Sequence, residues 1–254
     1  MHFAKKPQAG SGMSLYGPPD FTYRTSRRVI WIYEKLLTIY LRDISHDMPP
    51  EKKRKIAKGL SLVVIIAGVM VIIGWFFDIG ILKSISPAWV SMKFDTAIAF
   101  ILSGITLYFI VRAAEGEFDK AQVVLSITSL IIILLMGTLF FSSFLEIRTG
   151  VEDLFIKEAS GTVKTVTPGR PSLPTMFNFI LIASAGILTT LNPGNLRSKL
   201  KIIGVIVGLI GVMAMAGYIF NVPLLYYYIE GVNSAIALHT AALFMVLGIG
   251  FICL

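Results

Sequence analysis

The sequence has very little cysteine and few charged residues. Cys253 is its one cysteine, which excludes an intramolecular disulfide and a cluster of thiolates around a metal ion. Charged residues make up 15% of the chain, against roughly 25% in an ordinary soluble domain. Hydrophobic residues make up 55%, and the mean hydropathy is +0.77. This composition predicts an integral membrane protein.

Six apolar stretches reach or approach the roughly 20 residues that a helix needs to cross a bilayer. They are residues 60–77, 96–111, 123–145, 175–191, 202–220 and 235–254. We therefore expect an all-α membrane protein with six transmembrane helices. Residues 1–59 precede them as a basic tail, in which the pattern over residues 26–45 predicts an amphipathic helix at the membrane interface.

Asp, Glu, Lys, Arg and His are almost missing from the six stretches, where His239 is the one exception. Ion-coupled pumps and transporters normally carry such side chains along their path. The three histidines are far apart in the sequence, and no serine, histidine and carboxylate set with recognisable spacing is present. We therefore expect no enzyme activity, no metal site and no cofactor.

The distribution of lysine and arginine predicts the orientation, because cytoplasmic loops next to spans retain positive charge. Of the 23 basic residues, 17 lie in the tail and in the connections around 112–120 and 197–201, and six lie on the opposite side. Both termini are thus predicted to be cytoplasmic in the cell membrane. This topology accounts for the net charge of +8 and leaves nucleic-acid binding a poor interpretation.

A basic cluster lies just before the first stretch. Five cations at this position are attractive to anionic lipid headgroups at the bilayer surface. The cluster consists of Lys52, Lys53, Arg54, Lys55 and Lys58.

Three of the apolar stretches begin with the same short phrase, in which Phe follows Thr by four residues on one helical face. The phrases occupy residues 95–100, 174–179 and 239–244, and a small residue lies eight positions after each Thr. This repetition predicts three helical hairpins, at about residues 60–112, 121–191 and 202–254. All three phrases would then begin at the outer ends of helices.

The threonines of the phrases allow two interpretations. Hydroxyl and carboxylate groups at a helix start can cap unpaired N–H groups, which suits Asp95, Thr96, Ser172, Thr175 and Thr240. Alternatively, polar and aromatic side chains surround a shallow outer pocket beneath the loop at residues 146–173. The candidate pocket residues are Trp89, Asp95, Thr96, Thr175, Tyr226, His239 and Thr240.

Two further patterns concern packing. In the long outer loop, apolar and acidic residues over 151–158 predict a short amphipathic surface helix.

In the fifth stretch, Gly204 and Gly208 form a small-xxx-small pair, followed by Gly211 and Gly217. Such glycines predict a close helix–helix contact, within the chain or in a homodimer.

The outer segments carry a family resemblance. Residues 87–104, with Pro87-Ala88-Trp89-Val90 leading into Asp95-Thr96-Ala97, resemble the N-terminal membrane sensory region of prokaryotic sensor histidine kinases and diguanylate cyclases. The order and spacing of four later segments also match: residues 150–155, 168–172, 222–226 and 237–241. The resemblance covers residues 60–254 and implies a multi-span sensory protein. It departs from the family in its longer tail and in having no output domain.

We therefore expect a signal-input membrane protein that acts through a separate output partner. A structural or accessory subunit of a membrane complex is the alternative, and a permease for small uncharged solutes is a third reading.

Overall fold

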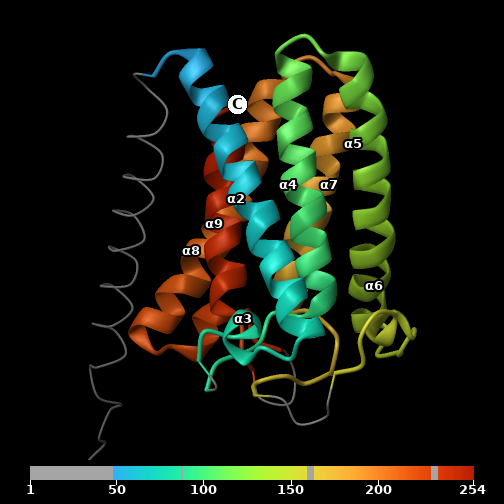
Figure 1. The fold of residues 1–254 in the computed structure, drawn as a ribbon, viewed down its shortest axis with the longest axis vertical. Helices are drawn as coiled ribbons and strands as arrows, with labels where there is room; N and C mark the ends of the chain where they lie inside the picture. Colours follow the sequence, from blue (N-terminus) through green and yellow to red (C-terminus); the bar gives the residue numbers. More distant parts are fainter. Residues whose placement is uncertain (1–47, 87, 159–162, 230–233) are drawn as a thin grey trace, which may run out of the picture. The chain divides into compact units, whose positions relative to one another are not determined.

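The computed structural model describes residues 48–254, except residues 87, 159–162 and 230–233. The interfacial helix expected at residues 26–45 lies outside the described residues. The described part is a bundle of long helices that run up and down (Figure 1). Within it, five helices are long and apolar enough to cross a membrane, and a sixth apolar helix is shorter. The predicted all-α fold is thus confirmed for this part, and its long apolar helices are compatible with a multi-pass membrane protein, although the last of the six predicted spans forms a shorter helix.

The five long helices and the shorter α9 form the bundle. They are α2 (Pro50–Phe76), α4 (Phe94–Ala114), the continuous helix Phe118–Phe144, α7 (Leu173–Leu191), α8 (Leu196–Phe220) and α9 (Leu238–Ile252). The helix Phe118–Phe144 contains α5 (Phe118–Ile132), a π-helical turn (Ile133–Gly137) and α6 (Thr138–Phe144). Three short elements lie in the connections: α3 (Gly80–Lys83), η2 (Val151–Asp153) and η3 (Pro223–Tyr226).

Helix α2 begins ten residues before the first predicted span. Pro50 occupies its first turn, where the missing N–H of proline has no intrahelical partner to lose. The basic cluster therefore lies on the first turns of a continuous helix. One of its members, Lys58, forms an ion pair of 2.5 Å with Glu115 at the end of α4.

The connections gather at the two ends of the bundle (Figure 1). One end carries the long segments 77–93, 145–172 and 221–237, whose described parts we call the loop cap. The other end carries Pro50, Leu254 and the tight turns 115–117 and 192–195, and we call it the terminal end. Helices α4, α7 and α9, which begin with the three repeated phrases, all start at the loop cap.

Two helix pairs meet through glycine in matching ways. A Cβ on Gly68 of α2 would lie 2.9 Å from the carbonyl oxygen of Ala97 in α4. A Cβ on Gly211 of α8 would lie 2.6 Å from the carbonyl oxygen of Ala241 in α9. Ala97 and Ala241 each follow the Thr of their phrase. The close contact predicted for the glycines of residues 202–220 is thus confirmed within the chain.

Candidate functional site

The helix starts at the loop cap share one geometry. Thr96, Thr175 and Thr240 are each the third residue of their helix, and the residue before each helix is extended, with φ of −69°, −67° and −66°. None of these helices has a side-chain capping hydrogen bond, so the capping interpretation is wrong. The hydroxyl of Ser172, which precedes α7, instead contacts the hydroxyl of Thr175 at 2.8 Å.

The structure brings the three threonines together. They line one cavity of about 10 Å³, closed by residues of the 90–93 and 235–237 segments and by Pro171 and Ser172. A volume of this size holds about one water molecule. The threonine part of the predicted outer pocket therefore exists, but it is not open to a larger ligand in this structure.

The phenylalanines of the phrases meet directly below. The ring centroids of Phe100 and Phe179 lie 4.9 Å apart, those of Phe100 and Phe244 also 4.9 Å, and those of Phe179 and Phe244 5.1 Å. All three side chains are completely buried. We call these residues the phenylalanine triad. Distances in this range are typical of favourable aromatic pairs, so the triad joins α4, α7 and α9 at the centre of the core.

Asp95 lies outside the threonine cavity. It lines a second cavity of about 10 Å³ together with Trp75, Lys93, Glu152 and Glu158. Its Oδ2 atom is buried and has no hydrogen-bond partner among the described residues.

The remaining candidates lie apart from both cavities. The Trp89 ring packs on Tyr218 with centroids 5.4 Å apart, and Tyr218 stacks on the buried Tyr226 at 4.5 Å. Both ring nitrogens of His239 are buried without a hydrogen bond of standard geometry to a described residue. The predicted pocket residues therefore divide into the threonine cavity, the cavity beside Asp95 and an aromatic row of Trp89 and Tyr226, and His239 belongs to none of these.

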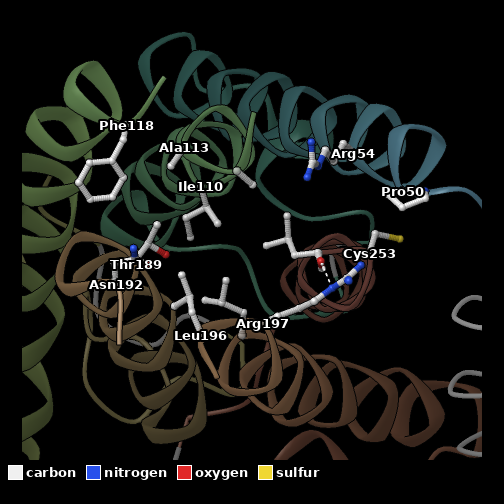
Figure 2. A pocket seen from close by; sticks show the side chains of 13 residues that line it. Pro50, Arg54, Ile110, Ala113, Phe118, Thr189, Asn192, Leu196, Arg197 and Cys253 are labelled. Atoms are coloured by element: carbon white, nitrogen blue, oxygen red, sulfur yellow. Dashed lines mark hydrogen bonds between the residues drawn. The ribbon is translucent and has the colours of Figure 1, made fainter. Parts of the chain in front are cut away.

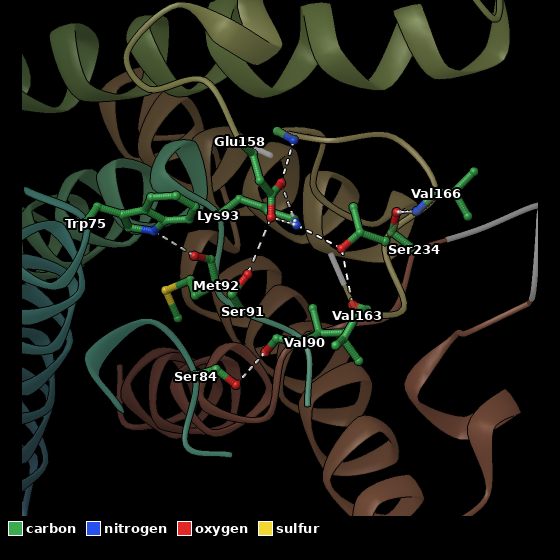
Figure 3. A network of polar contacts seen from close by, with 12 residues as sticks. Trp75, Ser84, Val90, Ser91, Met92, Lys93, Glu158, Val163, Val166 and Ser234 are labelled. Atoms are coloured by element: carbon green, nitrogen blue, oxygen red, sulfur yellow. Dashed lines mark hydrogen bonds and ion pairs between the residues drawn. The ribbon is translucent and has the colours of Figure 1, made fainter. Parts of the chain in front are cut away.

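A buried ion pair fastens the long loop to the start of α4 (Figure 3). The Lys93 ammonium lies 2.6 and 2.7 Å from the two carboxylate oxygens of Glu158, and these side chains are only 5% and 3% exposed. Lys93 also donates to Thr165 at 2.9 Å, and the N–H of Gly169 donates to Glu158 at 2.6 Å. Burial lowers the pKa of Lys93, although the Glu158 carboxylate opposes that shift. The loop is thus held by charge-assisted hydrogen bonds in a dry environment.

A second ion pair orders the same loop. The Arg170 guanidinium contacts the buried carboxylate of Glu152 and donates a 2.7 Å hydrogen bond to the Ile147 carbonyl. Burial raises the pKa of Glu152, but the hydrogen bonds from Arg170 and its own backbone N–H outweigh burial and leave that pKa below its ordinary value.

The loop also contacts the last hairpin. Lys164 donates to the Tyr226 hydroxyl at 2.8 Å, and its carbonyl accepts from the Ala235 N–H at 3.1 Å. The Val166 N–H donates to the Ser234 hydroxyl at 3.0 Å (Figure 3). The loop cap therefore ties together the connections of all three hairpins.

The sequence did not indicate this network. Residues 151–158 form the short 3₁₀ turn Val151–Asp153 followed by an irregular segment, so the predicted amphipathic helix is wrong. Glu152 and Glu158, expected on its solvent side, are buried and ion-paired. The only feature of the sequence that pointed to such ion pairs was the equal number of basic and acidic residues in the segments of the loop cap.

The two ion pairs neutralise the buried charges of the loop, and their hydrogen bonds hold the loop against the starts of the helices. Among the described residues, no group of three His, Cys, Asp or Glu side chains could hold a metal ion. No family model, curated protein or solved structure matches this chain.

Proposed function

We propose that this chain is a membrane signal-input protein that detects a cue at the loop cap and passes a helix movement to a separate output partner. The observation that carries this proposal is the direct connection between the cap and the core. Lys93, which anchors the loop through Glu158, immediately precedes α4, and Phe100 of the triad lies on the second turn of the same helix. A cue that loosens the cap would act on all three helix starts.

The proposal includes an orientation and a repeat. The excess of basic residues at the terminal end supports a cytoplasmic location for both termini and an outer location for the loop cap. The shared helix-start geometry supports three repeated hairpins, and the matching glycine contacts support the repeat for the first and the last of them.

The output would come from a separate protein. The basic cluster, Lys52 to Lys58, would lie against anionic headgroups of the cell membrane and keep the terminal end at that surface. Because the chain resembles the sensory regions of histidine kinases and diguanylate cyclases, we expect the partner to be a histidine kinase or a diguanylate cyclase.

A coupling experiment tests the proposal in the full chain reconstituted in lipid nanodiscs. Spin labels placed by Asp119→Cys and Ser198→Cys, in a Cys253→Ser background, report the distance between α5 and α8 at the terminal end. The change Glu158→Gln removes the charge that holds Lys93. We expect this change to shift or broaden that distance by about 1–2 Å, the size of helix shifts in known switches.

Lys157→Gln is the matched control, because it removes an exposed neighbouring charge that makes no contact in the buried network. Hydrogen exchange in residues 145–172 verifies that Glu158→Gln loosens the cap. If the cap loosens and the terminal end does not change, the signal-input proposal fails. The accessory-subunit reading, in which the cap serves packing alone, would then be preferred.

A permease receives less support. The cavities at the loop cap hold about one water each, and the phenylalanine triad fills the centre of the bundle below them. A solute path would have to open through both.

A further inference from the structure

A cavity much larger than those at the loop cap lies at the terminal end. It has a volume of about 370 Å³ and is enclosed by the ends of α2, α4, α5, α7, α8 and α9 (Figure 2). This volume falls within the range of small-molecule sites, roughly 300 to 1,000 Å³. The cavities of about 10 Å³ at the loop cap are thus far smaller than the cavity at the terminal end.

Two chemistries divide the walls of this cavity. Its apolar part includes Ile110, Ala113, Phe118 and Leu200. The Thr189 hydroxyl, also on the wall, donates to the Ala185 carbonyl of its own helix at 2.8 Å and is already satisfied. A ligand with many polar groups would leave them unpaired here, which is unfavourable. The interior therefore suits an alkyl chain.

The other part of the wall is cationic. Arg54 of α2 and Arg197 of α8 line the cavity, and no lining side chain is acidic. The Arg197 Nε atom donates to the backbone oxygen of Leu254 at 2.6 Å, which positions its guanidinium beside the cavity. An anion placed between these two guanidinium groups would be attracted by both.

We propose that this cavity binds a single-chain amphiphile with one anionic headgroup, either a carboxylate or a phosphate. The headgroup would pair with Arg54 and Arg197, and the chain would occupy the apolar part between α4 and α8. Arginine suits both headgroups because its planar fork donates two parallel hydrogen bonds. Such a molecule can reach the cavity from the bilayer surface, at the level where the helices end.

Photoaffinity labelling in phosphatidylcholine nanodiscs tests this proposal. The probe is a dodecanoic acid that carries a diazirine on its chain, and the labelled peptides are mapped by mass spectrometry. We expect labels on the cavity-lining turns of α4 and α8. Dodecanoic acid or dodecyl phosphate should compete with the probe. The stronger competitor of the two identifies the headgroup of the natural ligand. Dodecanol and inorganic phosphate should not, because each supplies only one half of the ligand.

Three variants make the test specific. Arg54→Gln combined with Arg197→Gln should weaken labelling about tenfold or more, as expected for lost charge-assisted hydrogen bonds. Lys199→Gln removes an exposed charge from the same helix without touching the cavity and should label normally. Ala113→Leu should reduce labelling by filling the cavity, whereas Ala113→Ser should not.

Several results would overturn the proposal. Labelling that dodecanol abolishes equally would show simple apolar partitioning. Labels confined to outward residues such as Leu62 or Val123 would show contact with lipid alone. Equal losses in the double arginine variant and in Lys199→Gln would show a general surface-charge effect. Thermal unfolding of each variant verifies that a loss of labelling does not come from a loss of fold.

Discussion

The indole N–H of Trp75 donates a hydrogen bond of 2.9 Å to the backbone carbonyl of Met92, four residues before Thr96. The hydroxyl of Tyr218 makes the corresponding bond, of 2.7 Å, to the carbonyl of Ile236, four residues before Thr240. In both hairpins an aromatic donor near the end of the first helix thus fixes the segment that leads into the second. Different side chains perform the same task at matching positions.

We expect Tyr218→Phe to destabilise the protein by about 1–2 kcal/mol, because it leaves the Ile236 carbonyl without its donor while keeping the ring. Trp75→Phe should cost more, since it also removes ring volume from the packed helix end. Reversible unfolding in detergent micelles measures both. Tyr228→Phe is the control, because its hydroxyl makes no hydrogen bond to a described residue. Equal effects in all three variants would contradict the assigned role.

The Lys93–Glu158 ion pair should show strong coupling. Lys93→Met or Glu158→Leu alone leaves a buried charge without its partner, which typically costs about 3–5 kcal/mol. The double variant Lys93→Met with Glu158→Leu should recover much of that loss, because it leaves no buried charge. A double-mutant cycle on the unfolding free energy measures the coupling.

Lys157→Met serves as the control in that cycle, because the Lys157 side chain is exposed. It should change the unfolding free energy by no more than a few tenths of a kcal/mol. Additive losses at Lys93 and Glu158 would contradict a direct pair.

Three glycines in the connections should respond to alanine in a graded way. Gly169 has φ of +76°, and a Cβ there would overlap the Glu152 carbonyl. Gly116 has φ of +101° but open space around it, and Gly194 has open space and no positive φ. We expect the loss of stability on Gly→Ala to be largest at Gly169, about 1 kcal/mol at Gly116, and close to zero at Gly194. Thermal unfolding of the three variants measures these losses. A different order of the three losses would contradict the backbone geometry described.

Glu152 should make the stability of the loop cap dependent on pH. Its pKa in the folded protein lies below the ordinary value of 4.5 because of Arg170, despite burial. The ionised carboxylate therefore stabilises the fold above that pH, and the contribution is lost as the pH falls through the folded-state pKa. Glu152→Gln should lower the melting temperature at pH 7, and the difference from wild type should narrow below about pH 4.5.

The change Arg170→Gln should reverse the direction of the pH dependence that Glu152 contributes to stability. Without the guanidinium, burial dominates and raises the pKa of Glu152, so the contribution of this carboxyl to stability should be present at low pH and be lost as the pH rises through the raised folded-state pKa. A melting-temperature difference between wild type and Glu152→Gln that stays constant from pH 7 to pH 3 would contradict the assignment.

The sequence predicted those parts of the fold that depend on local pattern. Apolar length gave the helices, and the Thr-x-x-x-Phe phrases marked three helices that start at the same end and meet through Phe100, Phe179 and Phe244. The start of α2 was placed too late, because the basic residues after Pro50 are polar but continue the helix. Hydropathy detects the apolar part of a span and not the full helix.

The candidate site was harder to predict because its contacts are long-range. Lys93 and Glu158 lie 65 residues apart, and an irregular loop with buried charges has no periodic pattern. Arg54 was assigned to the bilayer surface with its neighbours, although it lines a cavity with Arg197 of another helix. Which cation faces inward depends on the packing of α2 against α4 and α9, and composition does not contain that information.

The glycine contacts of α2 and α8 have a mechanical consequence. Side chains of the neighbouring helices fill the space beside these glycines, Ile101 at Gly68 and Met245 at Gly211, so neither helix can slide without first separating from its neighbour. The rings of the triad hold α4, α7 and α9 against each other. Helix α2 would then move together with α4, and α8 together with α9, as tightly joined pairs.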